Sequence, residues 1–199
     1  MKKVLKISLA ILIAILIILY GATIYLKSIV KKELTEEKLQ EIINSINSAP
    51  PLPKNFKETY SNVYVDVFET NFNFSFLLGL VSKRSYQQCP SRSVANWFVS
   101  RCYTRGNYLA FIWLLEDNVS QEKCFEYEAS KCDFTQNIIG IEQASLAFYN
   151  KPIDSLNIEE QLGMILKLKN PALYNEKRNQ DWYDKGIKEL KDKIASNRK

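Results

Sequence analysis

The chain has 199 residues and a mass of 23.1 kDa, which leaves room for one folded domain and a membrane anchor. Its net charge is +5, and its basic residues form no compact cluster interleaved with aromatic residues, so we do not expect nucleic-acid binding. The absence of histidine excludes Ser-His-Asp and Cys-His catalytic arrangements and histidine metal sites. With only 6 glycines and no glycine-rich phosphate loop, the sequence predicts neither a cofactor nor a metal.

The first predicted element is an uncharged stretch at residues 7–26. As a helix it would measure about 30 Å, which matches the hydrocarbon thickness of a bilayer. A cleaved signal peptide is the alternative, but the stretch is long and Tyr20-Gly21-Ala22-Thr23 is a poor cleavage site. We therefore predict a cytoplasmic tail at residues 1–6 and a transmembrane signal anchor at residues 7–26. The positive-inside rule keeps the short tail inside and exports the rest of the chain.

A charged, periodic segment follows at residues 27–50, and we interpret it as a stalk helix that continues from the membrane. Its apolar residues recur at the spacing of one helical face, and Pro51 and Pro53 stop it. The next stretch, residues 55–80, is ambiguous. Val63, Val65 and Val67 alternate as in a strand, whereas a wider set of aromatic and valine positions marks a helical face.

From residue 91 onward the pattern predicts helices. They are expected near residues 91–98, 108–115, 121–131, 141–149, 158–169 and 180–194. The clearest start is a capping box, with Asn157 as the N-cap and Glu160 three residues later, and Asn170-Pro171 ends that helix. The exported part is therefore predicted to be mainly α.

Four cysteines fit an exported domain: Cys89, Cys102, Cys124 and Cys132. Their spacing contains no Cys-x-x-Cys pair, so a zinc site is not expected. Two disulfides are one possibility, with three pairings open, of which Cys89–Cys102 with Cys124–Cys132 closes the shortest loops. Four buried free thiols are the alternative.

Residues 140–151, GIEQASLAFYNK, resemble the segment G-I-E-A-A-A-x-x-Y-F-G-K of the peptidoglycan glycosyltransferases. This is glycosyltransferase family fifty-one, which comprises the transglycosylase domain of class A penicillin-binding proteins and the monofunctional transglycosylases. Residues 154–156 and 170–175 keep the same register, resembling D-L-T-L and A-P-x-x-Y-N-P. Weaker similarity reaches back to residue 51. The resemblance implies a lysozyme-like α-helical, transglycosylase-like domain at residues 51–199, preceded by an N-terminal transmembrane helix.

The family's two catalytic glutamates are replaced on this register. One of them, in E-D-x-x-F-x-x-H-x-G, acts as a general base on the attacking sugar hydroxyl, and Tyr64 stands at its position. The other, in R-K-x-x-E, assists the leaving diphosphate, and Tyr108 stands there. A phenol with a pKa of about 10 is protonated at neutral pH. Loss of a positioned general base typically removes about 10²–10⁴-fold in rate, so the resemblance implies a pseudoenzyme.

The register also gives candidate residues for a substrate groove: Asn71, Ser91, Arg92, Asn96, Arg105 and Glu126. Among other acids, Asp66 and Glu69 are expected to turn away from Tyr64. Glu126, Glu128 and Asp133 are interpreted as solvated surface groups. The apolar run at residues 74–81 either dips into the membrane interface, as the family's jaw does, or packs in the core.

We therefore predict a membrane-anchored, catalytically inactive glycosyltransferase-like protein of cell-wall biogenesis. Its expected location is the bacterial inner (cytoplasmic) membrane, crossed once, with the bulk of the chain on the periplasmic or outer side. The expected partners are the lipid bilayer, a lipid-linked peptidoglycan precursor, and cell-wall synthesis or division proteins. Two alternatives stay open: an active glycosyltransferase with relocated carboxylates, and a membrane-tethered interaction module unrelated to glycan.

Overall fold

The computed structural model describes residues 2–75, 88–102 and 107–197, and it describes the side chains of residues 6–75, 88–98 and 107–197. The only extended pairing in these ranges is an isolated bridge between Asp133 and Ile139. The principal helices are α1 (Lys2–Glu33), α2 (Glu36–Asn47), α3 (Lys54–Val63), α5 (Pro90–Cys102), α6 (Tyr108–Glu116), α7 (Gln121–Lys131), α8 (Ile141–Tyr149), α9 (Ile158–Lys169) and α10 (Gln180–Asn197), with a short 3₁₀ helix at Ile153–Ser155. The predicted mainly-α class is confirmed.

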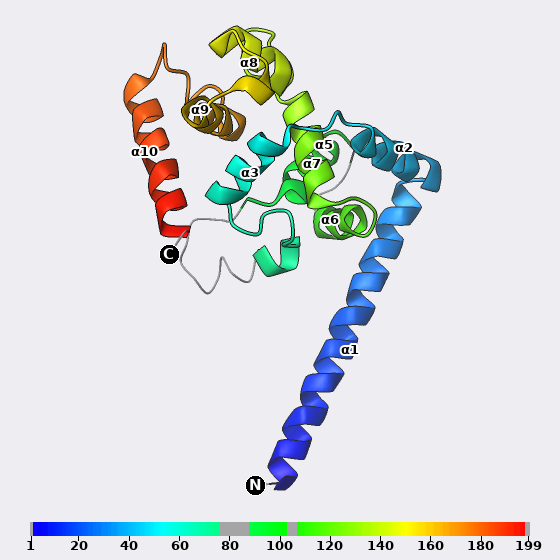
Figure 1. The fold of residues 1–199 in the computed structure, drawn as a ribbon. Helices are drawn as coiled ribbons and strands as arrows, with labels where there is room; N and C mark the ends of the chain where they lie inside the picture. The colour runs from blue at the N-terminus through cyan, green and yellow to red at the C-terminus, as the bar shows by residue number, and fades with distance from the viewer. Residues whose placement is uncertain (1, 76–87, 103–106, 198–199) are drawn as a thin grey trace.

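Helix α1 projects from the domain as a long rod (Figure 1). Between residues 6 and 33 it is long and apolar enough to cross a membrane, and its large apolar side chains are exposed as far as Tyr25. Its last turns belong to the domain instead. Val30 is fully buried, the Lys27 Nζ lies 2.6 Å from an oxygen of Asp117, and Glu33 accepts a hydrogen bond from Asn107. The apolar part of α1 therefore continues as one uninterrupted helix into the folded domain.

The predicted stalk helix at residues 27–50 is wrong in one respect, because the structure divides it into two helices. α1 ends at Glu33, and the Thr35 hydroxyl caps α2 by accepting a hydrogen bond from the Lys38 N–H. The apolar face of α2 is buried in the domain (Leu39, Ile42, Ile43 and Ile46). Burying this face stabilises the domain, so α2 turns away from α1 and becomes part of the fold.

Two apolar cores lie on either side of α7, the helix near the middle of the domain in Figure 1. The first core collects side chains from the end of α1 and from α2, α5 and α6, and Cys124 of α7 joins it. The second core collects side chains from α3, α8, α9 and α10, and Phe125 and Ala129 of α7 join it. Because α7 packs on both sides, its polar residues are held close to both cores.

The ambiguous stretch after the prolines begins as a helix, and its described part forms no strand. α3 runs to Val63, and the chain then makes tight turns in which Asp66 has a φ of 55°. Val63 and Val67 are buried while Val65 is exposed. Most of the apolar run at residues 74–81 lies outside the described residues, and its first residue, Phe74, is exposed.

The local predictions in the last third of the domain are confirmed. Asn157 Oδ1 accepts a hydrogen bond from the Glu160 N–H at 3.0 Å, and the Glu160 carboxylate accepts one from the Asn157 N–H at 2.8 Å. α8 begins after Gly140, which has a φ of 87° and approaches the Ser130 carbonyl so closely that a Cβ would lie 2.9 Å from it. Glycine is therefore required at that turn.

Candidate functional site

Tyr64 lies at the C-terminal end of α3, with its side chain buried in the second core. Its ring is 4.9 Å from that of Tyr60, and the Lys193 Nζ lies 5.1 Å from the ring centroid. Burial raises the pKa of Tyr64 to about 12, although a hydrogen bond with Gln88 opposes the shift. The phenol is therefore held in its protonated form at neutral pH, and it cannot act as a base there.

Tyr108 lies at the start of α6, half-buried beside the first core. Its hydroxyl donates a hydrogen bond to the Arg92 carbonyl at 3.3 Å. Burial raises the pKa of Tyr108, and hydrogen bonds with Arg92 and Asn96 only partly oppose this. The structure thus brings Arg92, Asn96 and Tyr108 together between α5 and α6. It does not bring Tyr108 into the pocket that Tyr64 lines.

The pocket beside Tyr64, called here the Tyr64 pocket, has a volume of about 120 Å³. Its wall includes Tyr60 and Tyr64 from α3, Ser93 from α5, Phe125 and Glu128 from α7, and Lys169 at the end of α9. Aromatic rings form one side, since the Tyr60 and Phe125 rings stack with centroids 4.0 Å apart. A pocket of this size holds a small group rather than a whole disaccharide.

Glu128 is the acid in this pocket, and the interpretation of it as a solvated surface group is wrong. The residue is partly exposed, but its carboxyl is withdrawn from water. Burial raises the pKa of Glu128 to about 7, and a hydrogen bond with Ser93 is too weak to reverse the shift. At neutral pH the carboxyl therefore exchanges readily between its protonated and ionised forms.

Sequence reasoning missed Glu128 although one signal for it was present. Phe125, Ala129 and Cys132 are buried and recur at i, i+4 and i+7 on one face of α7. Glu128 lies at i+3 of the same series, which places a carboxyl on the apolar face of a helix. Asp66, Glu69 and Asp133, by contrast, are exposed and are not among the residues that line the Tyr64 pocket.

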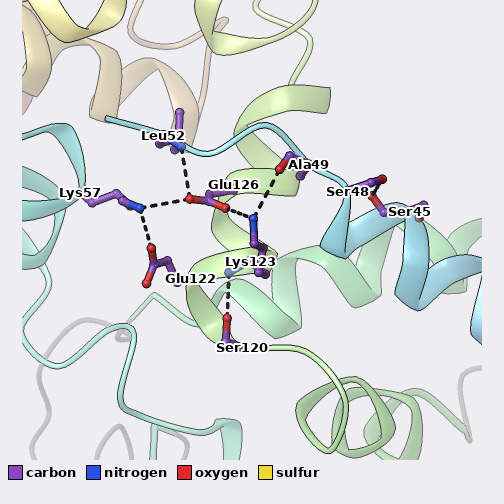
Figure 2. A network of polar contacts seen from close by, with 9 residues as sticks. All are labelled: Ser45, Ser48, Ala49, Leu52, Lys57, Ser120, Glu122, Lys123 and Glu126. Atoms are coloured by element: carbon purple, nitrogen blue, oxygen red, sulfur yellow. Dashed lines mark hydrogen bonds and ion pairs between the residues drawn. The ribbon is translucent and has the colours of Figure 1, made fainter. Parts of the chain in front are cut away.

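Glu126 points to the other side of α7 and is only 2% exposed. Figure 2 shows its carboxylate between three donors: the Leu52 N–H at 3.2 Å, the Lys57 Nζ at 3.2 Å and the Lys123 Nζ at 2.7 Å. Burial alone would raise the pKa of Glu126, but the hydrogen bonds from Lys123, Lys57 and Leu52 together lower it. Lys57 also pairs with Glu122 at 2.5 Å.

These contacts fasten the segment between α2 and α3 onto α7. Glu126 also borders a second pocket, of about 200 Å³, beside Pro50 and the start of α8. Both of its oxygens are already occupied by protein donors. The prediction that Glu126 belongs to a substrate groove is therefore not supported, and the geometry gives it a structural role.

The other predicted groove residues lie apart from the Tyr64 pocket. Asn71 is exposed and accepts a hydrogen bond from the Phe74 N–H at 2.9 Å. Ser91 is fully buried, and its hydroxyl donates to Glu116 at 2.8 Å, so it is part of the packing between α5 and α6. Arg105 lies outside the described residues.

The structure has Cys89, Cys124 and Cys132 as buried free thiols, which agrees with the free-thiol alternative and not with the two disulfides considered above. The side chain of Cys102 lies outside the described residues. Burial raises the pKa of Cys124 and of Cys132 to about 12 in each case, which keeps both thiols protonated. Within the described ranges, no group of three or more Cys, Asp or Glu side chains is placed to hold a metal ion.

The structure is thus a helical domain with a small pocket, and its N-terminal helix is long and apolar enough to cross a membrane. The family model for the transglycosylases matches residues 102–195, so this part of the chain is similar to a transglycosylase domain. Tyr108 falls inside the match, whereas Tyr64 precedes it, and its place in the first catalytic motif rests on the resemblance of residues 51–101. A search of the curated proteins gives no match.

Proposed function

We propose that this protein is a membrane-anchored, peptidoglycan glycosyltransferase-like protein of cell-wall biogenesis that binds a lipid-linked glycan without polymerising it. The observation that carries the proposal is the burial of the Tyr64 phenol. Tyr64 stands where the family has its general base, and the structure buries its phenol in a protonated form. The domain therefore keeps the scaffold and a pocket while the proton acceptor is missing from its usual place.

Polymerisation of glycan would require two kinds of catalytic group in the same site. A base must remove the proton of the attacking sugar hydroxyl, and other groups must stabilise the leaving diphosphate. Tyr64 cannot supply the first, and Tyr108, at the second family position, lies beside the other core and is hydrogen-bonded to Arg92. Binding has no such requirement, because a pocket with aromatic walls and polar groups suffices for it.

The anchor supports a ligand that itself lies in the membrane. α1 is long and apolar enough to span a bilayer, and its last turns are fixed to α6 by the Lys27–Asp117 ion pair. A domain held in this way stays within reach of the lipid surface. We propose that it lies on the outer side of the bacterial inner membrane, where a lipid-linked precursor would be accessible.

A second candidate function is an active glycosyltransferase in which Glu128 has taken over the role of the general base. The observation that favours it is the position of Glu128 in the Tyr64 pocket with a pKa near neutrality, which suits a general acid or base. Among the described residues, Glu128 is the single acid that lines the pocket, and the pocket volume is small for a disaccharide acceptor and donor. We therefore rank binding above catalysis.

The test uses the full-length protein in detergent micelles with a fluorescent lipid-linked disaccharide-pentapeptide. Binding is followed by fluorescence anisotropy, and chain growth is followed on a gel that resolves glycan polymers. We expect saturable binding, competed by moenomycin, and no polymer. Polymer that disappears in Glu128→Gln would establish the second candidate. Absence of both binding and polymer would refute the proposal and favour an interaction module that contacts a cell-wall protein.

A further inference from the structure

One lysine lines the Tyr64 pocket, and a second lies near both that lysine and the Tyr64 ring. Lys169 lines the pocket from the end of α9, and Lys193 of α10 lies over the Tyr64 ring. Burial lowers the pKa of Lys193, and the positive charge of Lys169 lowers it further, whereas Glu189 opposes the shift. In the part of the chain that the structure describes, no ion pair joins either lysine to an acid. Two like charges held close together in this way favour an anion beside them.

Glu128 occupies the inner wall of the same pocket. When ionised, it places a negative charge where a bound anion would lie, and it does so away from water, where screening is weak. When protonated, it is neutral and can donate a hydrogen bond to a phosphate or carboxylate oxygen. The two forms of this one carboxyl therefore have opposite effects on an anionic ligand.

We infer that the Tyr64 pocket takes the anionic head group of a ligand, that Lys169 and Lys193 attract it, and that Glu128 admits it only when protonated. The inference rests on the proposed function, in which the head group is the diphosphate of a lipid-linked glycan. The volume of about 120 Å³ suits a head group better than the whole glycan.

Among the described groups around Glu128, none that interacts with it changes charge near neutral pH. Tyr60 of α3 interacts with it electrostatically, as do Cys124 and Cys132 of its own helix, and burial raises the pKa of all three. They are therefore uncharged in the range of interest. Ser93 of α5 hydrogen-bonds to Glu128 and does not titrate.

Beyond these neighbours, Tyr64 is also protonated, and the two lysines are cationic groups of α9 and α10. The chain has no histidine, which is the residue that ordinarily titrates between pH 5 and 8. A pH dependence of binding over this range that Glu128→Gln abolishes therefore reports on Glu128.

The size of the effect follows from the titration of Glu128. With a pKa of about 7, its protonated fraction falls from about 90% at pH 6 to about 10% at pH 8. If only the protonated form accepts the ligand, the apparent affinity falls in proportion to that fraction. Binding should then be about tenfold weaker at pH 8 than at pH 6.

The experiment measures binding of the fluorescent lipid-linked disaccharide-pentapeptide to the full-length protein in neutral detergent at pH 6, 7 and 8. Wild type should lose about tenfold in affinity over this range. Glu128→Gln should bind at pH 8 as wild type binds at pH 6, with no pH dependence. Lys193→Gln should bind more weakly at every pH. Glu142→Gln, which removes an exposed acid of α8, is the matched control and should behave as wild type.

A separate arm identifies the source of the anion by adding an anionic phospholipid or inorganic pyrophosphate as a competitor. Competition by pyrophosphate with little effect of phospholipid supports the diphosphate. Stronger competition by phospholipid overturns that assignment. Binding of the glycan that is equally tight at pH 6 and 8 overturns the role of Glu128 and leaves the proposed function standing. Absence of binding at every pH overturns both.

Discussion

Replacing Glu126 with glutamine tests whether this residue holds the domain together or takes part in chemistry. The change preserves the shape of the side chain but removes its charge. The carboxylate is 2% exposed and accepts hydrogen bonds from the Leu52 N–H and from two lysines. Glutamine has a single acceptor oxygen, and its NH₂ group would face a lysine that also only donates.

Breaking a buried ion pair from one side costs about 3–5 kcal/mol. The side chains of Lys57 and Lys123 are 21% and 34% exposed, so water can partly replace the lost partner. We therefore expect Glu126→Gln to lower the free energy of unfolding by about 2–3 kcal/mol. For a protein of this size, that corresponds to a fall in melting temperature of roughly 4–12 °C.

The control is Glu122→Gln, because Glu122 pairs only with Lys57 and is 47% exposed. A surface pair of this kind contributes less than about 1 kcal/mol. Thermal unfolding of the two variants and wild type in the same detergent, followed by circular dichroism, measures the difference. If Glu126→Gln has the same melting temperature as Glu122→Gln, the structural role assigned to Glu126 is refuted.

The pH dependence of the same contribution has a definite sign. Its hydrogen bonds lower the pKa of Glu126 below that of the unfolded chain. The stabilisation is therefore complete above the ordinary glutamate pKa of about 4.3 and is lost as the pH falls through the lowered native value. The stability difference between wild type and Glu126→Gln should be constant from pH 6 to 8 and shrink in acid.

Three further predictions concern packing and buried groups. Gly163→Ala should destabilise the protein by about 1–3 kcal/mol, since the new methyl would overlap the hydroxyls of Tyr149 and Tyr183, and chemical denaturation measures the loss. Glu176→Gln should lower the free energy of unfolding by about 2–4 kcal/mol, because it leaves the buried Lys167 without its 2.5 Å ion pair. Combining it with Lys167→Met should recover most of the loss, and melting curves that show no recovery would contradict this. Cys89, Cys124 and Cys132 should react with a thiol reagent at pH 8 only after unfolding, and fast reaction at any of these three in the native protein, located by mass spectrometry, would refute their burial.

Features with a local cause could be predicted from the sequence. The capping box at Asn157 and Glu160 depends on residues three apart, and it forms as expected. The cap at Thr35 has a local signal as well, because a threonine followed by two glutamates is a typical helix start. The apolar periodicity after it was recognised, but periodicity does not say whether a face is covered by the domain or belongs to a free stalk.

The composition of the Tyr64 pocket could not be predicted in the same way. Glu128 and Lys169 come from helices that meet only in the folded domain, and neither occurs in a motif that would single it out. The pKa of Glu128 depends on the loss of water around its carboxyl, which is a property of the packing of α7 against its neighbours. The proposed replacement of glutamate by Tyr64, in contrast, rests on the resemblance alone.

The central claim is that the domain keeps a ligand pocket but lacks the base for glycan polymerisation. It is tested most directly by incubating the purified full-length protein with labelled lipid-linked disaccharide-pentapeptide and resolving the products by chain length. We predict that the substrate is bound and remains a monomer through prolonged incubation. Glycan chains that lengthen with time, in a preparation free of other polymerases, would contradict the account.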